Sequence, residues 1–175
     1  MPSVDLRAYV RDIPDFPTPG IVFKDITPLL LDAGALDSAV RSLAELVSSG
    51  TVDFVVAAEA RGFILGAALA RELGAGFVPA RKPGKLPGQT ISSQYTLEYG
   101  IDALELHADA LAGGSRVLVH DDLLATGGTA GALCALVAEL GAEIVGCAFL
   151  VELSFLGGRT RLAPNLVHSV IDYAA

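Results

Sequence analysis

The stretch Arg116–Thr129, RVLVHDDLLATGGT, decides the fold that we expect for this chain. Its apolar run Val117–Val119 has β-branched ends, which is typical of a buried strand. The acid pair Asp121–Asp122 and a short loop follow, and then the glycine-bearing turn Thr126–Thr129. After the turn, apolar residues recur at helical spacing as far as Gly141, which predicts a helix that ends there. A strand, an acid pair, a glycine-rich turn and a helix, in this order, indicate a phosphate-binding unit.

The turn and the acid pair have complementary chemical uses. Main-chain N–H groups beside the positive end of a helix form a nest that binds phosphate, and side chains at the glycines would block it. We therefore expect phosphate contacts from Ala125, Thr126, Gly127, Gly128 and Thr129. Asp121 and Asp122 stand one step earlier, where carboxylates can accept hydrogen bonds from a ribose diol and favour a cationic sugar centre. The stretch thus predicts a site for a 5-phosphoribosyl group; the alternative is an ordinary strand–helix junction with polar turn residues.

The rest of the chain alternates between strand and helix patterns. Further strands are predicted at 53–58, 76–80, 144–153 and 167–173, and helices at 36–47 and 63–73. Such alternation predicts an α/β fold, a mostly parallel twisted sheet flanked by helices on both faces. Ligands bind at the carboxyl ends of the strands in such sheets, where Glu59, Arg61, Asp121 and Asp122 are all placed.

Two segments interrupt the alternation. Residues 1–34 form an N-terminal arm, with a short amphipathic helix expected over 3–13 and an extended piece over 21–29. Residues 82–96, KPGKLPGQTISSQYT, are rich in Gly, Pro, Ser and Gln and are predicted to be a mobile lid loop. Residues 104–107 alternate as a strand of an antiparallel extension would. We find no repeat or linker, so we expect residues 1–175 to form a single domain.

Composition narrows the class of protein. Among the 175 residues 52% are hydrophobic, but no run approaches the ~20 apolar residues of a membrane span. The N-terminus has no long apolar core, so we expect no signal peptide, and Cys134 and Cys147 lack metal spacing, which favours reduced core thiols of a cytoplasmic protein. A net charge of −8 argues against nucleic-acid binding. Five of the twelve Lys and Arg residues nevertheless lie within Arg61–Lys85 and could meet an anion.

The motif DDLLATGGT resembles the 5-phosphoribosyl 1-diphosphate (PRPP) motif of type I phosphoribosyltransferases, and it closely matches the adenine phosphoribosyltransferases among them. Other segments are similar to the same family: PTPGIVFKDITPLL to its base-binding segment, EARGF to its pyrophosphate loop, RKPGKLP to its closing loop and LEYG to its catalytic glutamate motif. The resemblance extends through LVELSFLGG and is weakest over the C-terminal VHSVIDYAA. It therefore covers nearly the whole chain.

This resemblance implies a function and a set of roles. The family is expected to join adenine and PRPP into AMP and pyrophosphate in purine salvage, as a homodimer, with Mg²⁺ arriving on PRPP rather than in a protein metal site. Glu98 would be the acid/base, acting with Asp121 and Asp122 in catalysis, and a cis peptide would join Glu59 to Ala60. Pyrophosphate would be held by Arg61, Arg81, Lys82 and Lys85. Adenine would be held by Val22, Phe23, Lys24 and Leu124.

Alternatives remain open for the function and for single residues. A close alternative is a phosphoribosyltransferase for hypoxanthine or guanine, and a distant one is a nucleotide-sensing regulator, although this acidic chain offers no basic nucleic-acid surface. Phe23 could simply belong to the core, and the lid cations could be a solvated charge run. His120 stands where the family usually has an apolar residue. Strand alternation turns it away from Asp121, so we expect a satisfied or partly exposed imidazole without a catalytic role.

Overall fold

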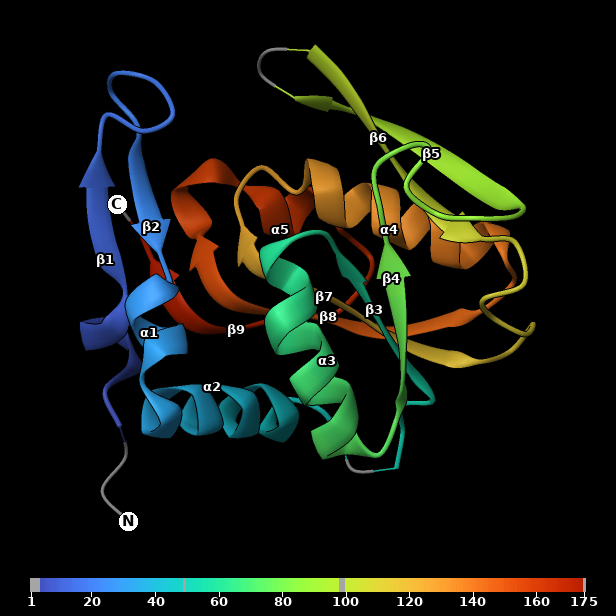
Figure 1. Ribbon diagram of the computed structural model, residues 1–175, viewed down its shortest axis with the longest axis horizontal. Helices are drawn as coiled ribbons and strands as arrows, with labels where there is room; N and C mark the ends of the chain where they lie inside the picture. The colour runs from blue at the N-terminus through green and yellow to red at the C-terminus, as the bar shows by residue number, and fades with distance from the viewer. Residues whose placement is uncertain (1–3, 49, 98–99, 175) are drawn as a thin grey trace.

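The computed structural model describes residues 4–48, 50–97 and 100–174 and has an α/β fold (Figure 1). Its central sheet contains five strands in the order β4-β3-β7-β8-β9, and every neighbouring pair is parallel. The strands are β3 (Phe54–Ala58), β4 (Gly76–Ala80), β7 (Arg116–Leu124), β8 (Glu143–Leu153) and β9 (Val167–Tyr173). From the adjacent strands β3 and β7 the chain continues to opposite edges of the sheet. This reversal opens a crevice at their carboxyl ends, where α/β proteins bind ligands.

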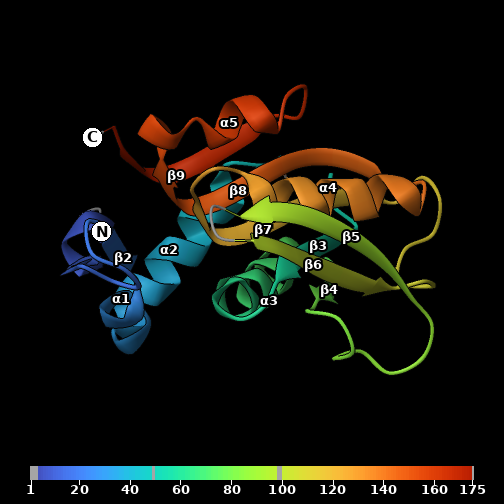
Figure 2. The same ribbon diagram turned by 90° about the horizontal axis from the view of Figure 1, so that it is seen from above.

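Helices cover both faces of the sheet, as the alternating sequence predicts (Figure 2). Helices α2 (Ala33–Glu45) and α3 (Arg61–Leu73) lie on one face, and α4 (Gly128–Glu139) and α5 (Gly158–Arg161) lie on the other. Successive β7 side chains enter different cores: Val117 and Val119 join the cluster around α4, whereas Leu118 joins the cluster around α2 and α3. A strand buried on both faces has to be apolar throughout, which explains the continuous run at 117–119.

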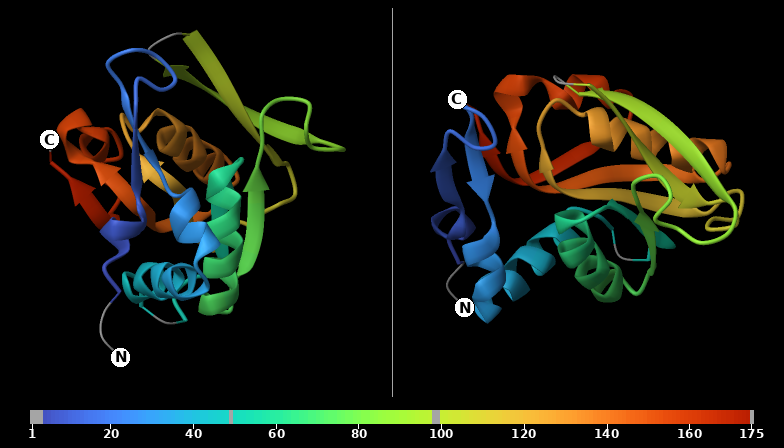
Figure 3. Two further views of the ribbon diagram at one scale, coloured as in Figure 1. Left: turned by 60° about the vertical axis from the view of Figure 1, so that its left-hand side comes forward. Right: turned by 45° about the horizontal axis from the view of Figure 1, so that its top comes forward.

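Two antiparallel ribbons flank the sheet (Figure 3). The first pairs β1 (Arg11–Pro14) with β2 (Val22–Asp25) and is bracketed by the 3-10 turn η1 (Leu6–Tyr9) and by α1 (Thr27–Leu31); we call residues 4–31 the hood. The Arg7 and Lys24 side chains both lie over the Tyr173 ring, which fastens the hood to the end of β9. The second ribbon is the hairpin of β5 (Thr90–Leu97) and β6 (Gly100–His107). It projects over α4, beside the carboxyl ends of the central strands.

The hood departs from the predicted elements at two places. The helix expected over 3–13 is wrong beyond Tyr9, because Arg11–Pro14 forms β1 and pairs with β2. The extended piece expected over 21–29 is wrong from Thr27 onward, where α1 begins. Pro28 lies in the first turn of α1, where a helix needs no N–H donor, so the proline begins a helix rather than only excluding a ladder position.

Two expected loops turn out to be strand. Residues 90–96 of the predicted lid form β5, which leaves 82–89 as the irregular part. Leu123 and Leu124, expected in a loop, continue β7 because they pair with Val151 and Glu152 of β8. The chain passes from β8 through the 3-10 turn η2 (Ser154–Leu156) into α5. Among the described residues no helix is both long and apolar enough to cross a membrane.

Candidate active site

A cleft of about 470 Å³ opens at the carboxyl ends of β3 and β7. Its walls come from the β3–α3 loop, the start of the lid, the hairpin, β7 and α4. They comprise Glu59, Ala60, Arg61, Lys82, Tyr95, Asp102, Leu104, Asp121, Asp122 and Thr129. A larger hollow of about 620 Å³ lies around Pro87–Gln89 and His107–Asp109, shares no residue with the cleft and gathers no cations. The cleft is the better candidate because titratable groups of both signs converge on it.

The phosphate turn, residues 125–129, borders the cleft at the start of α4. Its Gly127 is the N-cap of α4, has a φ of 80° and offers no side chain to cap the helix. The first N–H groups of α4 therefore have no intrahelical acceptor and stay available to an anion. Space at Gly128 is also tight, since an added Cβ would lie 3.3 Å from the Thr96 carbonyl oxygen of the hairpin above. The turn thus has the geometry that the sequence predicts for it.

Asp121 and Asp122 lie beside the phosphate turn and interact with each other. The Asp122 N–H donates to Asp121 Oδ1 at 2.9 Å. Burial, followed by the negative charge of Asp122, raises the pKa of Asp121 well above its usual value. The Arg61 Nε lies 2.8 Å from Asp122 Oδ2 in an ion pair, although its N–H is not directed at that oxygen, which is buried and accepts no hydrogen bond. The carboxyl pair is therefore short of hydrogen-bond donors, as a diol-binding pair would be before its ligand arrives.

The cations of the predicted lid are held by acids around the cleft. Arg81 Nε pairs with Glu59 Oε2 at 2.7 Å, and Lys82 Nζ pairs with Asp102 Oδ2 at 3.0 Å. The hydrogen bond to Asp102 raises the pKa of Lys82. Tyr95 and Asp102 face each other across the hairpin, and the Tyr95 hydroxyl donates to Asp102 at 3.3 Å. Sequence reasoning missed Tyr95 and Asp102, since only the register of the hairpin brings them to the cleft.

The residues expected to hold adenine are spread over the hood and the core. Phe23 lies under the guanidinium of Arg61, whose Cζ is 4.6 Å from the ring centroid. Val22 is half exposed on the same strand. Lys24 turns away to Asp12, with its Nζ 2.6 Å from Asp12 Oδ1. Leu124 is only 1% exposed and is not among the residues that line the cleft. Of the four, Phe23 is the one that the structure connects to the cleft, through Arg61.

The remaining sequence predictions fall at four places in the chain. Glu98, the expected acid/base, lies outside the described residues. Lys85 belongs to the lid, where its carbonyl oxygen accepts from Arg81 Nη1 at 3.4 Å. A cis peptide bond joins Glu59 to Ala60, as the resemblance implied. His120 was expected to be satisfied or partly exposed. It is fully buried, and it is satisfied at one nitrogen only: its Nδ1 is 2.9 Å from the Ala148 carbonyl oxygen, but its Nε2 has no partner.

The carboxylates of the cleft are the candidate ligands for a metal ion. Among the described residues there is no cluster of three or more His, Cys, Asp or Glu side chains that could hold an ion. Mg²⁺ usually keeps several waters and binds through one or two carboxylates plus substrate phosphates. The Asp121–Asp122 pair, with the unpartnered Asp122 Oδ2, fits a metal of that kind.

Comparison with known proteins agrees with this geometry. Residues 30–165 match the family described as the phosphoribosyl transferase domain. The adenine phosphoribosyltransferase of Synechococcus sp. (strain JA-3-3Ab) is 56% identical over 169 residues, which cover 96% of this chain and 97% of the relative. The chain belongs to the adenine phosphoribosyltransferase family. The resemblance inferred from DDLLATGGT is thereby confirmed, together with the predicted class of enzyme, a pentosyltransferase.

Solved adenine phosphoribosyltransferases share the fold. The crystal structure of the Thermoanaerobacter pseudethanolicus enzyme matches with a TM-score of 0.94 at 50% identity, over 97% of this chain and 98% of that one. The Saccharomyces cerevisiae enzyme, complexed with D-2,5-dideoxy-2,5-imino-altritol 1,6-bisphosphate and adenine, matches with a TM-score of 0.90 at 38% identity, over 95% and 96% of the two chains. The predicted fold class is confirmed by these matches.

Proposed function

We propose that the cleft carries out the adenine phosphoribosyltransferase reaction, in which adenine replaces pyrophosphate at C1′ of PRPP and AMP is formed. The reaction returns free adenine to the nucleotide pool, which is purine salvage. In this proposal the 5′-phosphate lies in the phosphate turn, the ribose lies over the acid pair and the base lies under the hood. The observation that carries the proposal is the acid pair, short of hydrogen-bond donors, beside an uncapped helix start.

The acid pair serves the sugar. A transition state that is cationic at C1′ gains from nearby negative charge, and a diol donates to carboxylates that lack donors. In the ligand-free protein burial and the negative charge of Asp122 raise the pKa of Asp121. Mg²⁺ on the diphosphate would be held by Asp121 and Asp122 and would neutralise the charge of the leaving group. Bound cationic charge would in turn favour full ionisation of both carboxyls.

Cations at the mouth of the cleft serve the leaving group. Arg81 and Lys82 both pair with acids, at 39% and 55% side-chain exposure, so exchanging these acids for a diphosphate costs little. Lys85 follows on the same loop. We propose that the irregular part of the lid, residues 82–89, carries Lys82 and Lys85 inward beside Arg81 when PRPP binds and excludes water from the reaction. Each of these cations would donate hydrogen bonds to the negative charge that develops on the leaving diphosphate. Replacing one of them should lower the rate about 10²–10³-fold.

Arg61 has two partners that the ligands would claim. Its guanidinium lies on the face of Phe23, where adenine would stack, and against Asp122, where the ribose would bind. Arg61 must therefore leave both positions to meet the diphosphate. The main chain near Val22 would contact the edge of the base. Lys24 and Leu124 would reach the base only after a rearrangement, since one is paired with Asp12 and the other is buried.

Glu98 is the proposed proton carrier for the purine ring. Glu98→Gln should lower kcat by about 10²–10⁴-fold, because a glutamine cannot exchange a proton with the base. Circular dichroism and Tm should match the unaltered chain, and Glu72→Gln on the exposed side of α3 is the matched control. A kcat near that of the unaltered chain would exclude Glu98 from proton transfer.

The function itself is tested by supplying one base at a time. AMP should form from adenine and PRPP with Mg²⁺, whereas hypoxanthine and guanine should give little nucleotide. Efficient nucleotide formation from hypoxanthine or guanine would overturn the base assignment, and absence of product with every base would overturn catalysis.

We also propose that the chain is one domain, with residues 1–34 as the base-binding arm, and that it works as a cytoplasmic homodimer. Sedimentation at twice the chain mass of 18.0 kDa would support the dimer, and sedimentation at 18.0 kDa would refute it.

A further inference from the structure

The short helix α5 packs directly against the phosphate turn. At their closest approach the two segments are both glycine. A Cβ added to Gly158 would lie 2.3 Å from the Ala125 carbonyl oxygen and 3.1 Å from the Gly127 nitrogen. A Cβ added to Gly127 would lie 2.8 Å from the Gly158 carbonyl oxygen. The two backbones are therefore in direct contact, and the placement of α5 decides which side chains lie beside the turn.

Arg161, the last residue of α5, stands at the start of α4. Its Cβ would be 3.3 Å from a Cβ on Gly127, and its Nη1 would be 3.8 Å from a Cβ on Gly128. The positive end of a helix disfavours a cation. No ion pair found among the described residues involves Arg161. A guanidinium held in this position without an acid becomes favourable once an anion occupies the turn.

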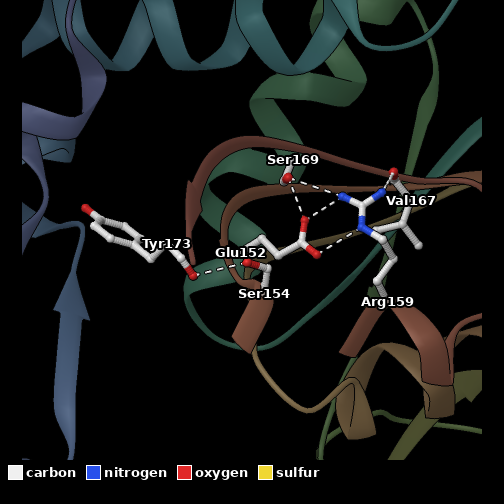
Figure 4. A network of polar contacts seen from close by, with 6 residues as sticks. All are labelled: Glu152, Ser154, Arg159, Val167, Ser169 and Tyr173. Atoms are coloured by element: carbon white, nitrogen blue, oxygen red, sulfur yellow. Dashed lines mark hydrogen bonds and ion pairs between the residues drawn. The ribbon is translucent and has the colours of Figure 1, made fainter. Parts of the chain in front are cut away.

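An ion pair between a half-exposed arginine and a buried glutamate fixes α5 (Figure 4). Arg159, two residues before Arg161, binds Glu152 of β8 through both carboxylate oxygens, at 3.0 Å from Nε to Oε1 and 2.5 Å from Nη2 to Oε2. Glu152 is only 3% exposed and also accepts from the Ser169 hydroxyl at 2.6 Å. Arg159 Nη1 donates to the Val167 carbonyl oxygen at 2.5 Å. We call Glu152, Arg159 and Ser169 the clamp. A two-point carboxylate–guanidinium pair restricts rotation as well as distance, so the clamp limits how the α5 backbone that carries Arg161 can turn.

We propose that Arg161 is a further ligand of the 5′-phosphate, and that the clamp positions it. The phosphate dianion would lie between the N–H groups of the turn and the guanidinium, which can donate two parallel hydrogen bonds to its oxygens. This inference rests on the proposed function, because it takes the turn to be the 5′-phosphate site. It adds to that function a binding residue 32 positions beyond Thr129, outside the PRPP motif.

Binding of AMP tests Arg161 directly. Calorimetry should show that Arg161→Met weakens AMP binding about tenfold or more, since a hydrogen bond to a charged group is lost, while binding of adenine alone is unchanged. Arg161→Lys should recover part of the AMP affinity. Arg71→Met, an exposed arginine on α3 remote from the cleft, should bind AMP as the unaltered chain does. AMP binding of Arg161→Met equal to that of the unaltered chain would overturn the inference. Failure of the unaltered chain to bind AMP would instead overturn the proposed function.

A double-mutant cycle tests the clamp. Glu152→Gln should weaken AMP binding in the unaltered background, because Arg159 loses one charged contact and α5 can turn. In the Arg161→Met background the same change should have a much smaller effect on AMP affinity, since the residue that it positions is gone. An equal loss of AMP affinity in both backgrounds would show that Glu152 acts by another route and would overturn the positioning role. Ser169→Ala, which leaves the Glu152–Arg159 pair intact, should show the same coupling with a smaller effect.

Discussion

Asp121 is a residue at which stability and function oppose each other. Its pKa is raised well above the usual value by burial and by the charge of Asp122. A carboxyl with a raised pKa in the folded state costs stability as pH rises through that pKa, because the unfolded chain releases the proton more readily. Asp121→Asn should therefore raise Tm at pH 7 and lower activity. About 1 kcal/mol corresponds to about 2–4 °C for a chain of this size.

Calorimetry over a pH series checks this prediction. The gain in Tm should shrink as pH falls toward the ordinary range of a carboxyl, where both states hold the proton. Asp109→Asn, which lies outside the cleft, controls for a general effect of lost charge. A Tm at pH 7 below that of the unaltered chain would show that Asp121 stabilises the fold and would contradict the assigned repulsion.

A substitution at Asp122 should affect binding of the sugar substrate more than binding of the base. Asp122→Asn removes the ion pair with Arg61 and half of the charge offered to the ribose. Its KM for PRPP should rise more than its KM for adenine, because Asp122 is assigned to the diol. Steady-state kinetics with each substrate varied in turn measures the two values. A change confined to the adenine KM would refute the ribose assignment.

Residues that follow a strand in sequence were predicted better than residues that meet it in space. Arg61, Asp121 and Asp122 could be assigned because the end of a parallel strand implies its position on the sheet. Tyr95 and Asp102 could not, since they face the cleft only through the register of the hairpin. The burial of Leu124 could not be predicted from the sequence either, because it depends on α5. The Leu124 Cδ1 lies where a Gly158 side chain would need space.

At the scale of elements, the contact between α5 and the phosphate turn should be intolerant of a single methyl group. Gly158→Ala would place a Cβ 2.3 Å from the Ala125 carbonyl oxygen, so either α5 or the turn must shift. AMP affinity should fall markedly. Gly131→Ala is the matched control, since a Cβ there meets nothing within 4 Å and replacing a helical glycine should stabilise by about 0.5–1 kcal/mol. Calorimetric binding and thermal unfolding distinguish the two outcomes, and unchanged AMP affinity in Gly158→Ala would refute the coupling.

The hairpin shows why composition misleads about an element. Its β5 strand is polar and follows a Gly- and Pro-rich segment, which favoured a loop over residues 82–96. A period of two was nevertheless present: Ile91, Ser93 and Tyr95 are half-buried, and the residues between them are exposed. Threonine and tyrosine also favour strands. The wrong prediction weighed polarity above alternation, although a strand with one face in solvent is expected to be polar on that face.

At the scale of the whole molecule, the sheet was predictable because its three central strands, β3, β7 and β8, each contain an apolar run. Burial on both faces demands uninterrupted apolar runs, and β7 and β8 supply them before any tertiary contact is considered. The hood lacks such runs, and its elements depend on pairing between β1 and β2 and on the Tyr173 contacts at the far end of the chain. Prediction was therefore reliable where local sequence and global burial coincide, and poor where a segment is shaped by a distant partner.

His120 is a buried residue of this sheet whose protonation should affect the stability of the whole molecule. Its Nδ1–H donates to the Ala148 carbonyl oxygen, which makes it a neutral imidazole with an unpartnered Nε2, and burial lowers its pKa to about 4. The unfolded chain takes up a proton near the ordinary value of 6.5, whereas the folded chain takes it up only near 4. Folding should therefore lose stability as pH falls from 6.5 to 4, by on the order of 3 kcal/mol.

Replacing the imidazole by a valine removes this proton uptake. His120→Val should flatten the fall in urea midpoint between pH 6.5 and 4, while other groups still contribute the remainder. Valine suits the strand, and the neighbouring Gly66 leaves space, since its missing Cβ would lie 3.3 Å from His120 Cδ2. His168→Val on β9 should keep the steep fall of the unaltered chain. An equally steep fall in His120→Val would mean that His120 is not the group that takes up the proton, and that acid unfolding of this sheet is driven elsewhere.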